Sequence, residues 1–435
     1  MEILSSILIS SVWPGHPVRF DLLTHKGHQF IAFYDADRKM TVGQRKLDED
    51  SFTLHRLEGR WLEARGRLST DLEWDSHNSV TMAIDRDDRI HLCGNMHVDP
   101  LIYFRTAKPL DVSTFERIDR MVGEDEDRCT YPVFFRGPSE ELMFRFRDGS
   151  SGNGVDFYNR YDESSESWQR LVSTPILDGM DAMNAYARMP EIGPDGKYHM
   201  VWMWRDTPDC ATNHDISYAT SADLVNWTAG DGSDLPLPVT VEAKPSIIDP
   251  VPPGGGLINM CQSLGFDGQD RPVVIYHKHD EAGFTQAYAA RLEGGSWNIV
   301  QLSEWDYRWA FEGGGSIGAE IRLGGARVAE EGYLKVSWWH LKKGSGVWKI
   351  DAETLDVVGE YPEPEDDTPQ ELSRVESDYP GMSVRTAGGR RVSKEEPDDG
   401  RRYVLRWETL SANRDRPRDE IPPPSELRLY TLGKR

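Results

Sequence analysis

One short pattern recurs along most of the chain: a polar turn that contains Asp or Gly, followed at once by an apolar strand. Turn residues followed by β-branched and aromatic residues are typical of β-hairpins. Helical periodicity over ten or more residues is nearly absent. We therefore expect an all-β protein. The copies of the turn are AIDRDDRIHLCG (83–94), IGPDGKYHMVWMW (192–204), FDGQDRPVVIY (266–276), VAEEGYLKVSWW (328–339) and the less regular RGPSEELMFRFRD (136–148).

The repeats have a long period as well as a short one. Strands recur about every ten residues and whole units about every 45 to 60, which is typical of four-stranded antiparallel blades around a central channel. The N-terminal segment 3–12 is expected to pair with segment 426–434, which closes the ring and removes a free sheet edge. The sequence thus predicts a seven-bladed β-propeller, with a pair of β-sandwiches as the competing fold. The expected units begin near residues 16, 77, 130, 184, 257, 319 and 400.

The chain length allows more than one arrangement of domains. A chain of 435 residues suits two or three ordinary domains or one large domain built from repeats. Because the repeats run along most of the sequence, we expect a single domain over residues 1–435. The acidic, Pro-rich stretch 360–399 fits no strand pattern, and a long loop or insertion is expected there.

The charge balance limits the partners. The formal net charge is −23, which argues against binding nucleic acid or an acidic membrane surface, since both need a basic face. An acidic substrate would need a local cluster of arginines. The apolar start, MEILSSILISSV, has no basic region and no A-x-A site and is too short to span a bilayer, so we expect a strand. Localisation stays open: cytoplasmic, or secreted or periplasmic if a signal has been removed.

The four cysteines are scattered and form no CxxC motif, so buried free thiols are expected rather than disulfides. One of them, Cys261, could join His277 and His279 as ligands of a zinc ion, because imidazole and thiolate suit that metal. The two histidines are two residues apart and would lie on the same side of a strand. Their spacing is not a standard zinc signature.

Two histidines, His77 and His97, flank an apolar hairpin whose turn is Asp85–Asp88. The hairpin would bring both imidazoles to the same end of two adjacent strands, where they could transfer protons near neutral pH. Alternatively, each histidine could be structural. His91 and His199 follow equivalent turns in two repeats, which indicates a structural role for those two.

Further candidates lie at strand ends in neighbouring units. Tyr131 lies in TYP, Arg147 in RDGSSGNG and Arg205 in WRDTPD, and in a propeller such ends gather on one face of the channel. The arginines could instead pair with Asp148 and Asp206, the acids that follow them.

Three more residues are expected to bind substrate. They are Asn78, beside His77, and Arg308 and Trp309, in the aromatic and glycine-rich segment WDYRWAFEGGGS.

Together these segments resemble the BNR-type propeller proteins, a group that includes ulvan lyases and rhamnose–glucuronate lyases. The resemblance covers roughly residues 13–345. It rests on the HN, IDRDDRIH, NMH and YFR pieces of segment 77–105, and on segments 20–47, 147–154, 204–221 and 306–317. It implies a seven-bladed propeller that cleaves uronic-acid glycosides by β-elimination. Its closest branch acts on rhamnose linked to glucuronic acid, as in arabinogalactan and gum arabic.

The resemblance also implies roles for single residues. His77 and His97 match the family's two active-site histidines, Tyr131 its tyrosine, Arg147 its arginine and Arg205 a further arginine. Arg147 would pair with the substrate carboxylate, and His77 and Tyr131 would supply base and acid in an order left open.

Other expectations follow from the same resemblance. No organic cofactor is expected, and relatives often carry a structural calcium or similar ion in the ring. The partner would be an acidic oligosaccharide or polysaccharide, and the protein a monomer or dimer. A related branch contains rhamnosidases with a histidine where this chain has Gln29. An α-L-rhamnosidase and a non-catalytic glycan-binding propeller are therefore the alternative functions.

Overall fold

The computed structural model describes residues 1–259, 261–363, 368–392 and 399–434. Within these ranges the secondary structure is β-strand with short 3-10 helices, which confirms the all-β prediction. In the described residues no helix has the length and apolarity needed to cross a membrane. The 3-10 helices are η1 (Val112–Thr114), η2 (Cys210–Thr212), η3 (Lys244–Ser246) and η4 (Gln370–Leu372).

The first three large sheets contain the N-terminal part of the chain after its first strand. Sheet 1 contains β35 (Arg390–Arg391), β2 (Asp21–His25), β3 (His28–Tyr34), β4 (Met40–Lys46) and β5 (Thr53–Arg56). Sheet 2 contains β8 (Val80–Ile84), β9 (Ile90–Gly94), β11 (Tyr103–Thr106) and β12 (Phe115–Ile118). Sheet 3 contains β10 (His97–Asp99), β13 (Cys129–Arg136), β14 (Leu142–Ser150), β15 (Asn153–Asp162), β16 (Ser167–Arg170) and β17 (Leu177–Asp178).

Two further sheets follow in chain order. Sheet 4 contains β18 (Asn184–Ala187), β19 (Glu191–Ile192), β20 (Tyr198–Arg205), β21 (Asn213–Ser221), β22 (Trp227–Thr228), β23 (Asp234–Leu235) and β24 (Ile247–Asp249). Sheet 5 contains β25 (Ser263–Phe266), β26 (Pro272–His279), β27 (Thr285–Glu293) and β28 (Ser296–Gln301).

The last two large sheets include both ends of the chain. Sheet 6 contains β29 (Ile321–Leu323), β30 (Arg327–Glu330), β31 (Tyr333–His340), β32 (Gly344–Asp351) and β33 (Val357–Tyr361). Sheet 7 contains β34 (Met382–Gly388), β36 (Arg402–Leu410), β37 (Ser425–Gly433) and β1 (Glu2–Val12). A small separate pair is β6 (Trp61–Leu62) and β7 (Arg67–Leu68).

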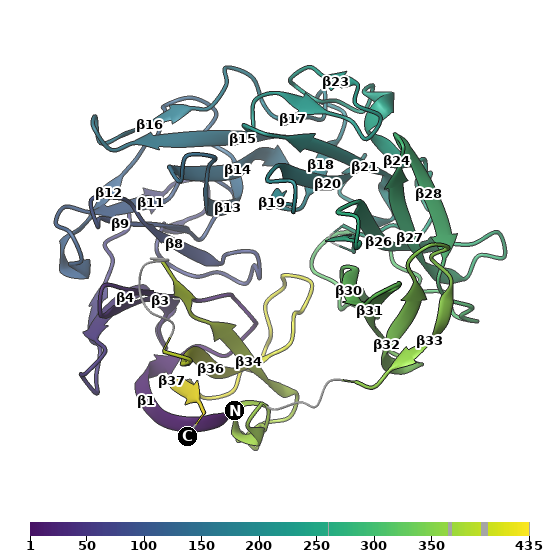
Figure 1. The fold of residues 1–435 in the computed structure, drawn as a ribbon. Helices are drawn as coiled ribbons and strands as arrows, with labels where there is room; N and C mark the ends of the chain where they lie inside the picture. Colours follow the sequence, from purple (N-terminus) through teal and green to yellow (C-terminus); the bar gives the residue numbers. More distant parts are fainter. Residues whose placement is uncertain (260, 364–367, 393–398, 435) are drawn as a thin grey trace.

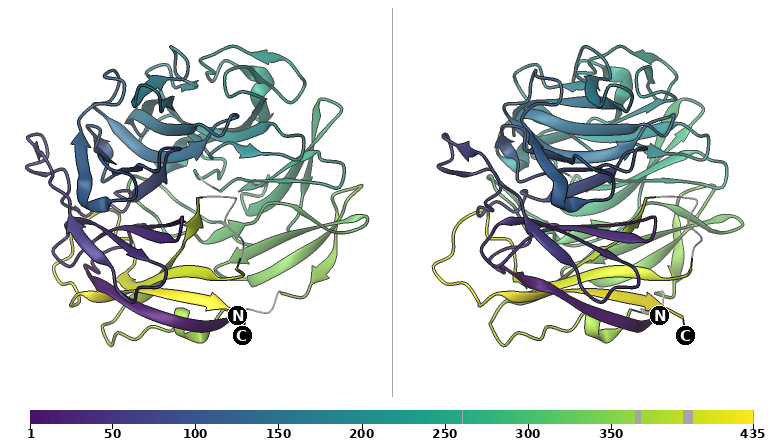
Figure 2. Two further views of the ribbon diagram at one scale, coloured as in Figure 1. Left: turned by 60° about the vertical axis from the view of Figure 1, so that its left-hand side comes forward. Right: turned by 90° about the vertical axis from the view of Figure 1, so that its left-hand side faces the viewer.

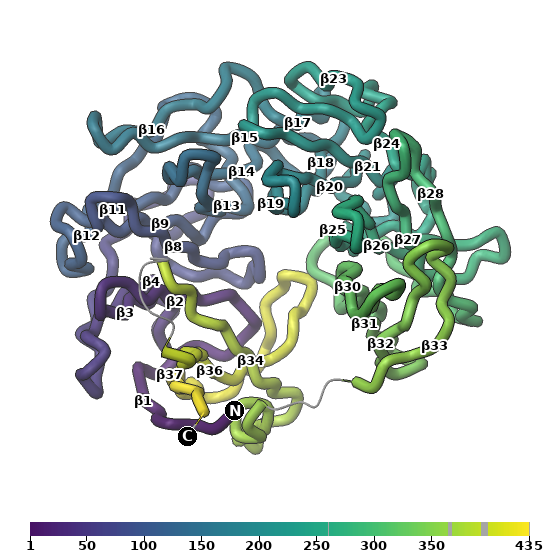
Figure 3. The backbone as a smooth tube through the Cα atoms, in the orientation of Figure 1, coloured from purple at the N-terminus to yellow at the C-terminus, as the bar shows by residue number. Residues whose placement is uncertain are grey.

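The large sheets follow one another in chain order around a common centre (Figures 1 and 3). In the described residues seven sheets have four or more strands, and three of these have four. The others carry additional short strands, and the β2–β35 pair is parallel, so the expectation of uniform four-stranded antiparallel sheets was too simple.

In two of the recurring turns an aspartate side chain holds the backbone in place. In the turn between β8 and β9, the Asp85 carboxylate accepts hydrogen bonds from the backbone N–H groups of Asp87 (3.0 Å) and Arg89 (2.8 Å). Asp267 does the same for Gln269 (2.9 Å) and Arg271 (3.0 Å) between β25 and β26. A short acidic side chain that binds its own following backbone fixes a tight turn. This explains the Asp in the repeated motif.

The histidines that follow two of these turns are structural, as predicted. His91 is fully buried, with Nδ1 2.7 Å from the Tyr103 hydroxyl and Nε2 3.1 Å from an Asp85 oxygen. His199 has the same arrangement, with Nδ1 2.6 Å from the Tyr218 hydroxyl. Both ring nitrogens are therefore occupied within the fold.

The two ends of the chain meet in sheet 7. β1 pairs with β37 in antiparallel register from Glu2 opposite Gly433 to Val12 opposite Ser425, which confirms the predicted pairing of the N-terminal strand. Both views of Figure 2 place the two termini side by side. β1 is the edge strand of its sheet, next to β37 and away from β34.

The stretch 360–399 differs from the expectation of a loop. Its residues 364–367 and 393–398 lie outside the described residues, but β34 and β35 fall inside it, and β34 pairs with β36 along its whole length. The seventh unit thus begins at Met382 rather than near residue 400. The side chains of β34 are half-buried or exposed, so this strand lacks the apolar alternation that identified the others.

Buried apolar clusters connect most neighbouring sheets. The largest extends through sheets 7, 1, 2 and 3, and smaller ones connect sheets 3 and 4, sheets 4 and 5, and sheets 5 and 6. In the described residues no such cluster connects sheet 6 to sheet 7. In β31 the alternate residues Lys335 and Ser337 are exposed while Leu334 and Val336 are buried. We call this boundary the 6–7 seam.

Candidate functional site

The predicted hairpin positions the two histidines. β8 pairs with β9, with Val80 opposite Gly94, so the segments before β8 and after β9 leave the same end of sheet 2. His77 precedes β8, and His97 begins β10, which pairs with β13 of sheet 3. The imidazole rings stack with their centroids 4.3 Å apart and an angle of 27° between their planes.

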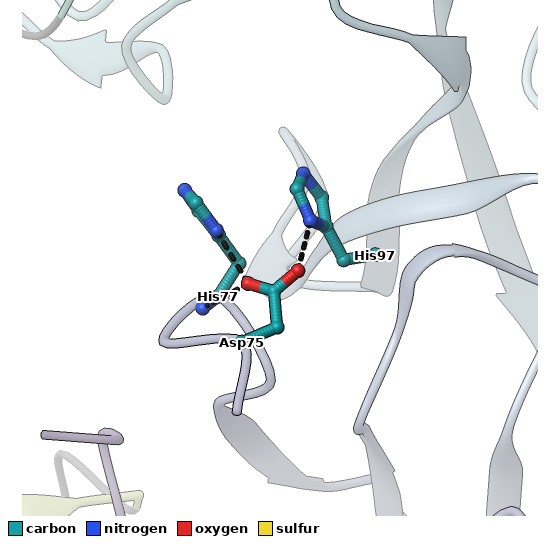
Figure 4. A group of neighbouring side chains, drawn as sticks. All are labelled: Asp75, His77 and His97. Carbon is teal, nitrogen blue, oxygen red and sulfur yellow. Dashed lines mark hydrogen bonds and ion pairs between the residues drawn. The ribbon is translucent and has the colours of Figure 1, made fainter. Parts of the chain in front are cut away.

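A carboxylate that the sequence analysis did not single out holds both rings. Asp75 Oδ1 lies 2.6 Å from His77 Nδ1, and Asp75 Oδ2 accepts a hydrogen bond from His97 Nδ1 (Figure 4). Since a carboxylate only accepts, both Nδ1 atoms carry the proton and each Nε2 is the free acceptor of a neutral ring. The Nε2 atoms point away from Asp75.

The interactions among Asp75, His77 and His97 shift the pKa values of Asp75 and His77. Burial raises the pKa of Asp75, but the hydrogen bonds from both histidines outweigh burial and hold that pKa well below its usual range. Burial lowers the pKa of His77, but the Asp75 hydrogen bond and the charges of Asp75 and Asp415 outweigh it, so the His77 pKa is raised. His77 can therefore exchange a proton near neutral pH.

Tyr131 reaches the histidines from an irregular stretch of β13. The register shifts between Thr130 and Val133, and Tyr131 has a φ of 56°, in the left-handed region that non-glycine residues seldom adopt. Its ring centroid lies 5.7 Å from that of His77 and 6.2 Å from that of His97. Burial is the main cause that raises the pKa of Tyr131, so its hydroxyl keeps its proton.

Arg147 is buried beside the ring of Tyr131. It is 2% exposed, and its guanidinium carbon is 5.0 Å from the Tyr131 ring centroid and 5.8 Å from that of Tyr186. None of its three guanidinium nitrogens has a hydrogen-bond partner within the described part of the chain, so the predicted alternative of a pair with Asp148 is not seen. A buried cation with no partner is costly and is typical of a site that binds an anion.

Arg205, at the end of β20, likewise forms no ion pair with a carboxylate of the described residues. Its guanidinium donates to backbone oxygens of Thr207 (3.0 Å) and Pro208 and lies 3.4 Å from the Tyr186 hydroxyl. The neighbouring Asp206 pairs with His214 instead, at 2.9 Å. The alternative in which Arg205 is neutralised by Asp206 is therefore wrong.

Tyr186 is a site residue that the sequence analysis missed. It lies in β18, and its hydroxyl is 3.0 Å from Ser151 Oγ. Burial raises its pKa, but the charges of Arg147 and Arg205 outweigh burial, so the Tyr186 pKa is lowered. Tyr131 and Tyr186, with centroids 6.3 Å apart, thus have pKa shifts of opposite sign.

These side chains line a cavity of about 580 Å³, within the range of roughly 300–1,000 Å³ that small-molecule sites occupy. Among those described above, His77, His97, Tyr131, Tyr186 and Arg205 reach its wall. Arg147 and Asn78 do not: Arg147 is 2% exposed and lies close to the rings of the two tyrosines, and Asn78 is 1% exposed. The structure therefore does not bring Asn78 to the cavity.

A loop from sheet 7 contacts the segments that border this end of the cavity. The loop between β36 and β37, yellow in Figure 1, extends toward the centre of the ring. Its Asp415 accepts hydrogen bonds from Ser76 N (3.0 Å) and Ser316 N (2.9 Å), and one carboxylate oxygen lies 3.8 Å from His77 Nδ1. Ser76 and Ser316 belong to segments that border the cavity, so Asp415 connects sheet 7 to both.

The other predicted substrate-binding residues lie at a second cavity. Trp309 is 4% exposed and borders both the main cavity and a neighbouring one of about 550 Å³. Arg308 lines only the second, and its guanidinium donates to the Gly283 carbonyl at 2.7 Å.

The predicted metal ligands do not come together. In the described residues the group of His, Cys, Asp or Glu close enough to share an ion is Asp75, His77 and His97. His277 is buried with Nδ1 3.1 Å from the Gly256 carbonyl, and His279 lines the second cavity. Burial raises the pKa of Cys261, so its thiol is a poor ligand. The zinc site proposed for these three residues is therefore wrong.

The main cavity has the groups needed for proton abstraction next to a carboxylate. It offers the Nε2 atoms of two imidazoles, two phenols with pKa shifts of opposite sign, and the Arg205 guanidinium, which pairs with no carboxylate within the described ranges. Pairs of titratable groups with opposite shifts are typical of acid–base catalysis.

Comparisons with known proteins agree with this fold. The chain is 28% identical to the ulvan lyase, short isoform, of Alteromonas sp. (strain LOR) over 142 residues, which are 29% of this chain and 26% of that protein. The match thus spans about a quarter of that relative. The crystal structure of polysaccharide lyase Uly1 superposes with a TM-score of 0.61 at 13% identity, covering all of both chains. The structure of a PL25 ulvan lyase superposes with a TM-score of 0.60 at 14% identity. The superposition covers 99% of this chain and 96% of the other.

At such identities the superpositions show a shared fold. The sequence itself identifies the family, because the profile described as "BNR repeat-containing family member" matches residues 28–305, more than half of the chain. The resemblance found in the sequence is thereby confirmed. The protein belongs to the BNR repeat-containing family.

Proposed function

We propose that this protein is a polysaccharide lyase that cleaves the glycosidic bond to a uronic acid by β-elimination. The observation that carries the proposal is the pair of arginines, Arg147 and Arg205. Neither pairs with a carboxylate among the residues that the structure describes, and both adjoin a cluster of proton-transfer groups. The names of the relatives support the same reaction, since they are described as ulvan or polysaccharide lyases.

The first requirement of the reaction is neutralisation of the substrate carboxylate. Elimination removes the proton at C5, and the adjacent carboxylate resists a second negative charge. A preorganised cation that pairs with this group stabilises the developing dianion, often by several kcal/mol. Arg205 is suited to bind the carboxylate because it lines the cavity, and a guanidinium fits a carboxylate bidentately. Arg147, which lies close to the rings of Tyr131 and Tyr186, adds positive potential.

The second requirement is an acid for the leaving oxygen at C4. Tyr131 is our candidate, because its raised pKa keeps the hydroxyl protonated and its strained backbone holds the ring beside the histidines. For the base there are two candidates. One is the Nε2 of the histidine pair, and the other is Tyr186, whose lowered pKa favours the phenolate. Variants of Tyr186 and Asp75 distinguish the two.

The proposal extends to the substrate class. We propose a rhamnose–glucuronate linkage of the ulvan, arabinogalactan or gum arabic type. Ulvan has direct support from the relatives, one of which is described in complex with -[GlcA(1-4)Rha3S]-. Since the chain carries a net charge of −23, the unpaired arginines would supply the local attraction for an acidic polymer.

The finer features of the fold belong to this proposal as well. We propose that residues 1–435 form one domain, a closed seven-bladed propeller, and that the protein acts as a monomer or dimer without an organic cofactor. The β1–β37 pairing supports closure through sheet 7.

The test is an elimination assay on ulvan, gum arabic and arabinogalactan. A lyase product absorbs in the ultraviolet, because elimination creates a double bond between C4 and C5. His77→Ala and Tyr131→Phe should each lower the rate by about 100-fold or more. His28→Ala is a matched control, because His28 lies on β3 with Nδ1 2.9 Å from the Lys26 carbonyl and does not line the cavity. Wild-type rates in both site variants would overturn the assignment.

The same assay distinguishes the alternatives. Release of rhamnose without the absorbance would identify a hydrolase, and binding without any product would identify a glycan-binding propeller. No observation of the site favours either. Gln29, the position where related rhamnosidases are expected to carry histidine, is fully buried, and its Oε1 accepts a hydrogen bond from Arg45 (2.8 Å).

A further inference from the structure

Asp75, His77 and His97 together have the donor atoms of a metal site. One ligand atom of each lies within 4.8 Å of the others, and among the described residues this is the one such group. Neighbouring ligands of an ion with bonds of about 2.1 Å lie roughly 3.0–3.4 Å apart, so small side-chain rotations would bring the three atoms onto one ion. Two imidazoles and a carboxylate suit divalent transition metals such as Zn²⁺, whereas Mg²⁺ and Ca²⁺ prefer oxygen ligands alone.

An ion can reach these three side chains from solvent. Each of them is 25% exposed, and both histidines line the main cavity. Three protein ligands leave at least one coordination position for water, which is typical of accessible metal sites rather than of closed structural ones. The group is therefore suited to an ion that binds and leaves reversibly.

Without an ion, protons join the same three side chains. Both Nδ1 atoms carry a proton toward Asp75, with His77 Nδ1 2.6 Å from one carboxylate oxygen and His97 Nδ1 bound to the other. An ion that takes the Nδ1 lone pairs requires both protons to leave these atoms. A neutral imidazole keeps its proton count when the proton moves to Nε2, so each ring would exchange one tautomer for the other. The two Nε2 atoms would then donate instead of accept.

We propose that Asp75, His77 and His97 bind one divalent transition metal ion, such as Zn²⁺, and that the bound ion inhibits the enzyme. The ligands are a carboxylate oxygen of Asp75 and the Nδ1 atoms of both histidines. The inhibitory part rests on the proposed function with the histidine pair as the base, because an Nε2 atom that carries a proton cannot accept another from C5. The metal site itself does not depend on the reaction.

The first experiment measures metal binding without substrate, because an acidic glycan would bind cations itself. Metal-free wild type, Asp75→Asn, His97→Asn and the control His28→Ala are titrated with Zn²⁺ by calorimetry and with Co²⁺ by visible absorption. We expect one ion per chain in the wild type and in His28→Ala, and affinity lower by about 100-fold in the two site variants. Thermal unfolding without metal checks that each variant is folded.

Two results would overturn the metal site. If Asp75→Asn bound Zn²⁺ as tightly as the wild type, the carboxylate would not be a ligand. Titration with Mg²⁺ measures the general attraction of a chain with net charge −23 for cations. Equal affinity for Mg²⁺ and Zn²⁺ would mean that the imidazoles do not take part in binding.

The second experiment tests inhibition with the elimination assay. Saturating Zn²⁺ should lower kcat of the wild type and of His28→Ala by about 100-fold, and a chelator should restore it. Binding without loss of kcat would overturn the inhibitory role. The two proposals fail in different ways: an active enzyme that binds no Zn²⁺ keeps the lyase function and excludes the metal site. A protein that binds Zn²⁺ through Asp75 but cleaves no substrate keeps the metal site and excludes the lyase function.

Discussion

His77 and His97 stack face to face at 4.3 Å and share a single carboxylate, with one oxygen of Asp75 bound to each ring. One residue therefore sets the tautomer and orientation of both imidazoles. In metal sites and catalytic triads a carboxylate often orients one histidine in this way. Here the same side chain orients two.

The first prediction concerns stability and pH. The pKa of Asp75 is lowered in the folded protein, so its contribution is present above its unfolded pKa of about 3.9 and is lost on acidification. The pKa of His77 is raised, so its contribution is present below its unfolded value of about 6.5 and is lost as pH rises through the folded pKa. Asp75→Asn should therefore lower Tm most near pH 5.

Thermal unfolding between pH 3 and 9 checks this prediction. Asp87→Asn is the control, because Asp87 lies in the turn between β8 and β9, away from the cavity. A Tm difference between wild type and Asp75→Asn that does not change with pH would contradict the assignment of charges.

The second prediction separates stability from activity at Arg147. Removing a buried cation without a partner relieves its desolvation cost, so Arg147→Met should stabilise the fold by about 1–3 kcal/mol. The same change should lower kcat/KM by about 100-fold, because positive potential is lost at the tyrosines. Denaturant unfolding and the elimination assay measure the two effects.

Arg145, on the same strand as Arg147, is a buried arginine that does have a carboxylate partner. It is also buried, but it pairs with Asp156, with Nε 3.0 Å from a carboxylate oxygen. Arg145→Met should destabilise the protein by about 3–5 kcal/mol, since it leaves Asp156 buried and unpaired. If both variants destabilised the protein equally, Arg147 would have a partner in the folded state.

The third prediction identifies the base. If Tyr186 abstracts the C5 proton, Tyr186→Phe should lower kcat by about 100-fold or more, because general-base catalysis is lost. If the histidines do so, Tyr186→Phe should retain kcat within about tenfold. In that case Asp75→Asn should move the acid limb of the pH–rate profile to lower pH, because Asp75 raises the pKa of His77. Ser151→Ala, which removes only the partner of the Tyr186 hydroxyl, is the control.

The fourth prediction concerns the loop from sheet 7. Asp415→Ala removes the acceptor for Ser76 and Ser316, so the loop should lose its attachment to the cavity and kcat/KM should fall about tenfold. The pKa of His77 should also fall, since the Asp415 charge helps to raise it. Asp419→Ala, an exposed change on the same loop, should leave both properties as in the wild type.

The repeated turns and the hairpin spacing made much of this structure predictable. The Asp-containing turns predict tight connections between strands. His77 and His97 lie at similar distances on either side of the turn Asp85–Asp88, which predicts that the two side chains lie together. The pairing of the chain ends was also predictable, because segments 3–12 and 426–434 both alternate in β-forming residues.

The roles of Tyr186 and Asp415 and the strand β34 could not be predicted from local sequence patterns. Tyr186 lies inside NAYA, where alternation alone indicates a core tyrosine, and its position at the cavity depends on Arg147 and Arg205 from other strands. Asp415 comes from the opposite end of the chain and reaches His77 only through the ring geometry. β34 has few buried side chains, so pairing with β36 rather than apolar alternation makes it a strand.

Among the described residues no apolar cluster crosses the 6–7 seam, so we expect partial unfolding to begin at this boundary. Sheets 7, 1, 2 and 3 share the largest cluster and should behave as one cooperative unit, with the slowest amide exchange. The exposed face of β31 borders a boundary with little apolar surface to lose, so partial opening should begin there. Unfolding would then separate a stable half-ring, containing both termini, from a less protected arc formed by sheets 4 to 6.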